Sequence, residues 1–497
     1  MVKCVTSEKG IGMTGEKPER GVAAESFLYE NVADRIARLI RKGTYRTGER
    51  IPSVRSLSKQ MDVSISTAVK AYFHLENQGL IEARPQSGYY VRHQLSRVQH
   101  ETDVGLPAPA PTLVSVGELV MMVMRDMRNP GLVPLGVATP NPENLPADKL
   151  NRILATVARR NNFQAISYEF PPGNERLRVQ LAQRALQAGC SLAPDQFVIT
   201  SGCLEAVMLS LRAVCRPGDT VAIETPIFYN LLQLIEMLNL KALEIPTHPI
   251  DGISLSALRY ALEHNPVHAC LVIPNFNNPF GSRMPEKNKQ ELVKLLASHN
   301  IPLIENDVYG DLGFLNDRPS VAKRYDRKGL VIHCSSFSKT LAPGYRVGWV
   351  VAGKFQESIE KLKAVSNIAT ATLPQMAIAE FLANGGYDQY LRKIRGVYGR
   401  QTSLMAKAVE RYFPKGTKVN TPSGGFVLWV EMPEAVDSIQ LYEEALRSGI
   451  TIAPGTIFSA TGKYGNFIRL NAAYWSKRIE QAVATVGGLA RNLSDVG

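Results

Sequence analysis

Two spacings of apolar residues divide the chain into an N-terminal and a C-terminal part. Near the N-terminus, an amphipathic helix is predicted by the three- and four-residue spacing of Val32, Ile36, Leu39 and Ile40. From about residue 116 onward, short apolar runs such as DTVAIETP and GLVIHCSSFS alternate with helical stretches. The first pattern predicts a small helical domain, and the second predicts βαβ units around a mostly parallel sheet.

Helix caps and turns indicate the order of elements over residues 25–92. Ser53 precedes a predicted helix, VRSLSKQM, and Ser64 precedes another, ISTAVKAYFHLENQG, which ends at Gly79. The next segment, LIEARPQSGYYVR, predicts two short strands around a turn. Two helices joined by a tight turn and followed by a β-wing are typical of a winged helix-turn-helix, whose third helix enters the major groove of DNA.

Polar and basic side chains of this block are candidates for contact with DNA. Hydroxyls at the start of the third helix suit phosphates or base edges, and the wing is placed to reach the minor groove. The candidates are Arg55, Ser64, Ser66, Thr67, Lys70, Arg84, Gln86 and Gly88. The formal net charge of +12 permits a polyanion partner without requiring one. A small helical interaction domain with solvated charges is the alternative.

The stretch from GTYRTGERIPSVRS to SGYYV resembles the DNA-binding domain of the GntR regulator family, and it covers nearly the whole N-terminal block. The resemblance implies a double-stranded DNA operator as partner. One position departs from the pattern, because the family often has arginine where this chain has Ile65. No base preference therefore follows from the resemblance.

Two segments lack apolar periodicity. Residues 93–115 contain Pro-Ala-Pro-Ala-Pro, which stays extended and predicts an interdomain linker. Residues 1–24 are polar and charged, without the apolar stretch of a signal peptide, which predicts a flexible tail in a cytoplasmic protein. The six cysteines form no CxxC pair, so free thiols are favoured over disulfides or a metal site. No apolar run is long enough to span a bilayer.

Lys339 lies in SSFSKTLAPGYRVGW, a serine-rich loop that follows a predicted buried strand. Ser336 and Ser338 offer hydroxyls, and Arg346 follows seven residues after the lysine. A phosphate needs such donors, and a semi-buried, cation-rich setting lowers the pKa of a lysine that acts as a Schiff-base nucleophile. The alternative, a solvated surface lysine, does not explain these neighbours.

Further motifs follow other predicted strands. ITSGCLEA places Gly202 and Cys203 at a strand-to-helix turn, where backbone N–H groups bind anions. Phe228, in ETPIFYN, is placed to stack on a planar ring or to pack in the core. Asn278, in NNPFG, offers a side-chain amide. The strand end in IENDVYG contributes Asn306, Asp307 and Tyr309.

Taken in order, these motifs resemble the fold type I aminotransferases that depend on pyridoxal 5′-phosphate (PLP), over nearly all of residues 115–497. The resemblance implies an α/β domain over 116–497 with a smaller C-terminal α+β subdomain, and it makes Lys339 the catalytic lysine that holds PLP covalently. It assigns the phosphate of PLP to Gly202, Cys203, Ser336, Ser338 and Arg346.

The same resemblance gives roles to five further residues. Phe228 would stack on the cofactor ring, and Asn278 and Tyr309 would bind its 3′-oxygen. Arg469, in FIRLN, would bind the α-carboxylate of an amino acid. Tyr168, in ISYEFPPGNERLR, would reach the phosphate of the neighbouring site, a role that needs a homodimer.

One position of the resemblance stays open. The family places an aspartate against the pyridine nitrogen, which keeps the ring protonated as an electron sink. The residue three positions before Tyr309 is Asn306, and the residue two positions before it is Asp307. Successive strand residues face opposite ways, so only one of them faces the ring. Asn306 has the more usual spacing, and its neutral amide would make transamination slow.

A winged helix joined to an aminotransferase-like domain resembles the MocR subgroup of the GntR regulators. That resemblance implies a PLP-dependent, homodimeric transcriptional regulator that senses PLP or an amino compound. A working aminotransferase with an accessory DNA-binding domain is the alternative, and a PLP carrier without an operator is a third hypothesis.

Overall fold

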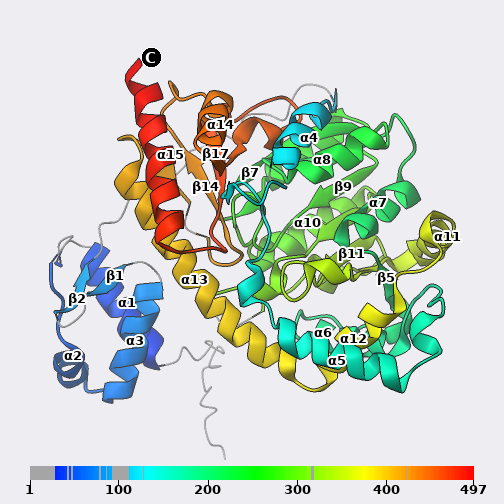
Figure 1. Cartoon of the computed structure of the whole chain (residues 1–497), viewed down its shortest axis with the longest axis horizontal. Coiled ribbons are helices and arrows are strands. Elements are labelled where there is room, and N and C mark those ends of the chain that lie inside the picture. The colour runs from blue at the N-terminus through cyan, green and yellow to red at the C-terminus, as the bar shows by residue number, and fades with distance from the viewer. Residues whose placement is uncertain are drawn as a thin grey trace, which may run out of the picture. The chain divides into compact units, whose positions relative to one another are not determined.

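The computed structural model describes residues 28–41, 44–45, 49–77, 80–84, 87–91, 111–126, 128–314, 318–420 and 422–496. The chain divides into two compact units, residues 1–97 and 98–497, which are described separately (Figure 1). The predicted tail over 1–24 and residues 92–110, which include most of the predicted linker, lie outside the described residues.

The N-terminal unit has the predicted order of three helices and a hairpin. The helices are α1 (Leu28–Arg41), α2 (Val54–Met61) and α3 (Ile65–Asn77), and strands β1 (Ile81–Arg84) and β2 (Gly88–Val91) pair in antiparallel fashion. Ser53 caps α2, since its hydroxyl accepts a hydrogen bond from the backbone N–H of Ser56 at 3.2 Å. Ser64 caps α3 in the same way through the N–H of Thr67 at 3.1 Å.

A small apolar core holds this unit together. Ile36 of α1, Leu57 of α2 and Leu75 of α3 are all buried in it. The buried Tyr72 of α3 donates its hydroxyl hydrogen to the carbonyl oxygen of Pro52 at 2.6 Å, which ties α3 to the chain before α2. The core therefore fixes the angle at which α3 is presented.

A nine-stranded sheet forms the centre of the C-terminal unit. Eight strands lie in the order β3 (Thr112–Leu113), β7 (Lys241–His248), β6 (Thr220–Thr225), β9 (Ala269–Val272), β10 (Leu303–Asn306), β11 (Val331–Ser336), β12 (Gly348–Val351) and β5 (Val198–Thr200). The ninth, β8 (Gly252–Ile253), pairs with β7. The five central strands from β7 to β11 are parallel, and β12 is antiparallel to both neighbours.

Alternate residues of the central strands enter two different apolar clusters. In β6, Val221 and Ile223 pack on one side of the sheet, and Ala222 packs on the other. In β10, Ile304 belongs to the first cluster and Leu303 to the second. A parallel sheet that is buried on both faces explains why its strands appear in the sequence as continuous apolar runs.

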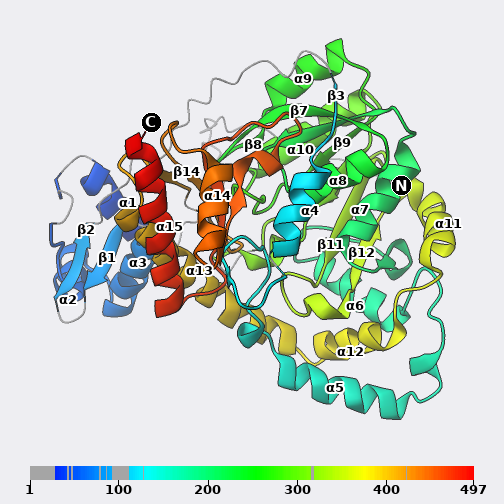
Figure 2. The ribbon, with the colours of Figure 1, turned by 45° about the horizontal axis from the view of Figure 1, so that its top comes forward.

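Helices cover both faces of this sheet (Figures 1 and 2). The first cluster receives α7 (Cys203–Val214) and α8 (Tyr229–Met237), and the second receives α9 (Leu255–His264) and α10 (Glu286–Ser298). The remaining helices before the C-terminal subdomain are α4 (Gly117–Asp126), α5 (Ala147–Arg160), α6 (Glu175–Ala185), α11 (Gln356–Asn367) and α12 (Thr372–Ala383).

The C-terminal subdomain has the predicted α+β character. Its antiparallel sheet runs in the order β13 (Lys418–Val419), β14 (Val427–Glu431), β17 (Phe467–Asn471) and β16 (Ala453–Pro454). The long α13 (Gly386–Tyr412) runs from beside α12 to this sheet (Figure 1), where it packs against α15 (Lys477–Val496). The remaining helix is α14 (Ser438–Arg447), and β4 (Val133–Pro134) pairs in parallel with β15 (Ile450–Thr451).

The end of the predicted linker is part of the large sheet. Thr112 and Leu113 form β3 and pair with Ala242 and Lys241 of β7, and Val114 is buried in the first apolar cluster. The packed part of the C-terminal unit therefore begins before residue 116, because these residues carry a strand and a core contact after the prolines end. Among the described residues, no helix has both the length and the apolar character needed to cross a membrane.

Candidate cofactor site and candidate DNA-binding surface

The turn after β5 forms a close contact with Arg346. Gly202 has φ +97°, and a Cβ on it would lie 2.5 Å from Nη2 of Arg346. That nitrogen donates to the carbonyl oxygen of Ser201 at 2.9 Å, and Nη1 donates to Oγ of Ser338 at 3.3 Å. Only glycine has both the conformational freedom and the small size that this position needs. The N-terminus of α7, two serine-containing segments and a guanidinium thus meet in one place, as a phosphate site requires.

Lys339 follows this loop and is partly buried. Its Nζ donates to the carbonyl oxygen of Ala138 and lies 6.0 Å from the centre of the Tyr309 ring. Burial, together with the positive charges of Arg469 and Arg346, lowers the pKa of Lys339 to about 8. A lysine with that pKa is neutral in a useful fraction near neutral pH, as a nucleophilic amine must be.

Two polar groups beside Lys339 are buried without a hydrogen-bond partner among the described residues. They are the hydroxyl of Tyr309 and Nε of Arg469. Arg469 also donates from Nη1 to Oδ1 of Asn278 at 3.4 Å and from Nη2 to the carbonyl oxygen of Gly136. A buried polar atom without a partner is costly, so both atoms fit a bound ligand that offers oxygen atoms.

Asn306 and Asp307 point to opposite sides of β10. Asn306 shares the side of Ile304, and its Oδ1 accepts hydrogen bonds from Sγ of Cys203 and from the backbone N–H of Val308, both at 3.3 Å. Asp307 pairs instead with Arg318 and accepts from Nδ2 of Asn275 at 2.8 Å. The structure thus places Asn306, and not Asp307, beside Cys203 and the turn at Gly202.

The Asp307 side of β10 holds a chain of buried ion pairs. Arg318 contacts both Asp307 and Asp311, the latter at 2.8 Å, and Arg184 of α6 lies 3.6 Å from Asp311. Burial alone would raise the pKa of Asp307, but Arg318 and His333 outweigh it and hold that pKa well below its usual range. Asp307 is therefore committed to structural pairing.

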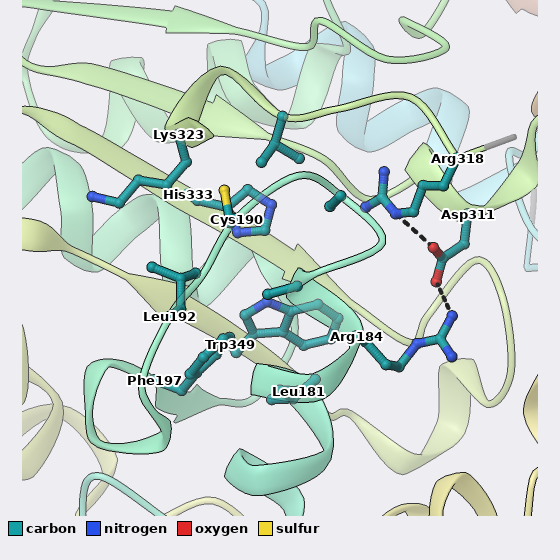
Figure 3. A pocket seen from close by; sticks show the side chains of 13 residues that line it. Leu181, Arg184, Cys190, Leu192, Phe197, Asp311, Arg318, Lys323, His333 and Trp349 are labelled. Atoms are coloured by element: carbon teal, nitrogen blue, oxygen red, sulfur yellow. Dashed lines mark ion pairs between the residues drawn. The ribbon is translucent and has the colours of Figure 1, made fainter. Parts of the chain in front are cut away.

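A separate small cavity lies beside this chain of ion pairs (Figure 3). Its volume is about 40 Å³, which is room for a few water molecules and too little for a cofactor ring. The labelled side chains around it include Arg184, Cys190, Asp311, Arg318, His333 and Trp349. Neither Lys339 nor Asn306 lines it, so it is distinct from the candidate cofactor site.

Three further residues were predicted to serve the cofactor site, and the structure connects only some of them to Lys339 and Arg346. Ser336 is buried at the end of β11 and accepts a hydrogen bond from the backbone N–H of Ser338 at 3.3 Å. Phe228 precedes α8 and contacts the Tyr229 ring at 4.8 Å, so its ring also serves core packing. Tyr168 is 71% exposed, and its ring centre lies 5.7 Å from that of Phe170.

Sequence reasoning missed a buried cation behind the phosphate-type turn. Lys363 of α11 is buried, and its Nζ contacts Glu205 at 3.0 Å and Thr370 at 2.8 Å. Glu205 in turn accepts a hydrogen bond from the backbone N–H of Ser201. Lys363 and Glu205 thus support the turn at Ser201 and Gly202 from the side of α11. The only sequence signal was an acidic residue in the first turn of a predicted helix, which is common at helix starts.

The start of α3 gathers the predicted DNA-contacting hydroxyls. Oγ of Ser64 lies 2.8 Å from both Oγ of Ser66 and Oγ1 of Thr67. Lys70 is exposed one turn further on, and Arg55 is exposed on α2. These residues share the surface that a helix-turn-helix presents to DNA.

The predicted wing contacts are less fully described. Gly88 lies at the start of β2 with φ +106°, and a Cβ on it would lie 3.2 Å from Nε of Arg50. Arg84 ends β1 opposite Gly88 in the hairpin. Gln86 lies outside the described residues. The hairpin itself is the wing that the sequence predicted.

Both halves of the chain match known protein families. Residues 28–91 match the bacterial regulatory proteins of the gntR family, and residues 143–486 match the aminotransferase class I and II family. YdcR of Escherichia coli, an uncharacterized HTH-type transcriptional regulator, is 39% identical over 93% of this chain and 98% of its own length. The chain belongs to the MocR type of HTH regulators.

Other similarities agree with this MocR-type architecture. A second uncharacterized HTH-type transcriptional regulator of Escherichia coli, YjiR, is 37% identical over 92% of this chain and 98% of its own length. The crystal structure of Pyrococcus horikoshii kynurenine aminotransferase superposes with a TM-score of 0.70 at 27% identity. It covers 77% of this MocR-type chain and 94% of its own. The class I and II aminotransferase fold belongs to a PLP-dependent family.

Proposed function

We propose that this chain is a transcriptional regulator that binds an operator through its winged helix and holds PLP at Lys339 in its aminotransferase-like domain. The observation that carries the proposal is that the partly buried Lys339, the exposed Arg346 and the buried Asn306 meet at one site, on a chain that also carries a GntR domain. A regulator that binds an operator would act in the cytoplasm, where the DNA is.

The residues of this site fit PLP in several ways. The turn at Gly202 and the guanidinium of Arg346 would hold the phosphate. The unpartnered hydroxyl of Tyr309 would donate to the ring 3′-oxygen, with Asn278 beside it. When bound, PLP supplies an aldehyde that reacts with primary amines and a ring that accepts electrons.

Asn306 favours a sensor over a fast catalyst. Its Oδ1 is already used by Cys203 and Val308, which leaves its amide Nδ2 without a partner in the described part of the chain. An amide N–H donates a hydrogen bond to an unprotonated pyridine nitrogen and carries no charge to hold a proton there. The electron sink would therefore be weak, whereas reaction of the aldehyde with an amine relies less on it.

Arg469 is suited to bind a second ligand of the sensor, an amino-acid effector. Its guanidinium is fully buried, makes no ion pair among the described residues, and lies beside Asn278 and the carbonyl oxygen of Gly136. Such a cation is suited to the carboxylate of an amino-acid effector. An amino compound held here would compete with Lys339 for PLP and so change the state of the domain.

A homodimer would complete the site. Phe163, Ile166, Tyr168 and Phe170 are exposed large apolar side chains in one short segment, and such a cluster indicates a protein interface. Thr372 at the start of α12 anchors this segment by donating to the carbonyl oxygen of Ser167 at 2.7 Å. A second copy packed here would bring its Tyr168 to the neighbouring phosphate. The molar mass of the protein in solution tests this assembly, and a monomer at working concentration would contradict it.

The pH dependence of PLP capture tests the environment of Lys339. With a pKa of about 8, the neutral amine increases about tenfold per pH unit below 8 and saturates above it. The rate constant for PLP capture by the apoprotein is expected to rise in this way and then level off. It would be measured by stopped-flow absorbance. A rate that keeps rising to about pH 10 would show an ordinary solvated lysine.

Genomic footprinting tests the function as a whole. Full-length protein would be footprinted on genomic DNA without PLP, with PLP, and with PLP plus candidate amino acids. Discrete protected sites that change with PLP or an amino acid are expected. Sites that never change would contradict the sensor, and absence of any protected site would contradict the regulator. Fast conversion of amino donors to keto acids would favour the aminotransferase alternative.

A further inference from the structure

Helix α3 carries a row of apolar side chains that remain exposed. Ile65, Val69 and Phe73 recur every four residues and are 56%, 45% and 62% exposed. The core of the unit packs against an adjacent side of the helix, where Ala68, Ala71 and Leu75 are fully covered. The core therefore does not account for the exposed row, and a row of large apolar groups in water indicates a surface that is covered when the protein works.

The first half of this row lies among groups suited to DNA. Ile65 and Val69 occupy the first five residues of α3, beside the hydroxyls of Ser64 and Ser66 and the ammonium group of Lys70. Residues 28–91 carry ten lysines and arginines against six aspartates and glutamates. A surface of this charge and hydroxyl content favours DNA over an apolar protein surface as the occupant.

The major groove offers a single kind of apolar group, the C5-methyl of thymine. Guanine and adenine are read there by donors and bidentate amides, and neither isoleucine nor valine has such groups. We propose that Ile65 and Val69 select thymine, by packing against C5-methyl groups in the major groove of the operator. This inference rests on the proposed DNA binding and adds to it the bases that α3 reads.

Phe73 provides an internal comparison. It lies eight residues beyond Ile65, about 12 Å further along the helix axis. The N-terminal residues of a recognition helix contact base edges, so Phe73 lies beyond that contact. A protein partner would instead cover the whole row, including Phe73. The two occupants therefore predict different effects of Phe73→Ala.

The first test uses the full-length protein without any substitution and varies only the DNA. Duplexes would be selected in vitro from a random pool, and each thymine of the selected site would then be replaced by deoxyuridine, which lacks only the C5-methyl. Affinity is expected to fall about fourfold at each thymine whose methyl α3 buries. Equal affinity for every uracil-substituted duplex would overturn the inference, and because this arm uses no variant it does not depend on mutant folding.

Variants then assign the effect to side chains. The native protein is expected to bind a duplex with thymine more tightly than one with uracil at certain positions. Ile65→Ala and Val69→Ala should each lose this preference at one of those positions. Phe73→Ala should still distinguish thymine from uracil. Lys70→Ala should lower the affinity for every duplex and the salt dependence of binding, and it should also still distinguish thymine from uracil. Discrimination that survives both Ile65→Ala and Val69→Ala, or that is lost in Phe73→Ala, would overturn the inference. Selection of no duplex at all would overturn the proposed DNA binding itself.

Discussion

Replacing Lys339 by alanine is expected to abolish the absorbance band of PLP bound covalently to the protein. The amine of Lys339 is partly buried and lies near the ring of Tyr309. Burial and the positive charges of Arg469 and Arg346 lower its pKa to about 8. No other described lysine shares that setting. Loss of covalent capture should be complete, because alanine has no nucleophile.

Two control variants make the result specific. Lys339→Arg keeps a positive charge but forms no such bond with the aldehyde, so it should also lose the band. Lys354→Ala removes an exposed lysine from the turn just before α11 and should leave the band unchanged. Spectra would be recorded after gel filtration with excess PLP. A persistent band in Lys339→Ala would place the covalent bond at another lysine and contradict the assignment.

Replacing Asn306 by aspartate is expected to raise the residual transaminase rate. A carboxylate at this position would hold a proton on the pyridine nitrogen, which strengthens the ring as an electron sink. A hydrogen bond between charged groups is stabilising by about 1.5–3 kcal/mol, which corresponds to roughly ten- to a hundredfold in rate. Single-turnover conversion of PLP with amino donors would measure it, since product release does not enter.

The neighbouring residue is the matched control. Asp307→Asn should leave the rate of that chemistry unchanged and lower the unfolding temperature instead, because it would leave Arg318 poorly paired in a buried place. An unchanged rate in Asn306→Asp, with a changed rate in Asp307→Asn, would show that Asp307 faces the ring. That result would also remove the main argument for a sensor over an enzyme.

The strands of the large sheet were predictable where both faces are buried. The apolar runs DTVAIETP and GLVIHCSSFS became β6 and β11, and caps at Ser53 and Ser64 gave the starts of α2 and α3. Strand β7 was missed because Glu244 and Pro246 interrupt its apolar run. Glu244 is nevertheless buried, since its carboxylate accepts hydrogen bonds from Thr461 and from the backbone of Ala460. Those partners lie more than 200 residues away, where no local pattern shows them.

The sequence motifs predicted which residues belong to the candidate site, but they did not predict which of these side chains lie together. Spacing alone left Asn306 and Asp307 as alternatives, and the partners on each side of β10 distinguish them: Cys203 for one, Arg318 for the other. Arg318 and Lys363 could not be found from the sequence, because their roles depend on carboxylates brought close by the fold. The exposure of Ile65 likewise follows from which side of α3 packs in the core.

The chain of ion pairs behind β10 bears on which segments of the large unit can separate from one another. Asp307, Arg318, Asp311 and Arg184 join a strand end, a loop and α6, and Arg184 extends the chain to Asp388 of α13 at 2.8 Å. Detaching the segment of any of the four inner residues would unbalance their charges, which is costly. Helix α13 also reaches these pairs through Tyr387, whose hydroxyl donates to Asp311 at 2.9 Å. The backbone amide protons of these segments should therefore exchange with solvent in one shared opening event. An effector that moved α13 would have to carry the β10 side of the cofactor site with it.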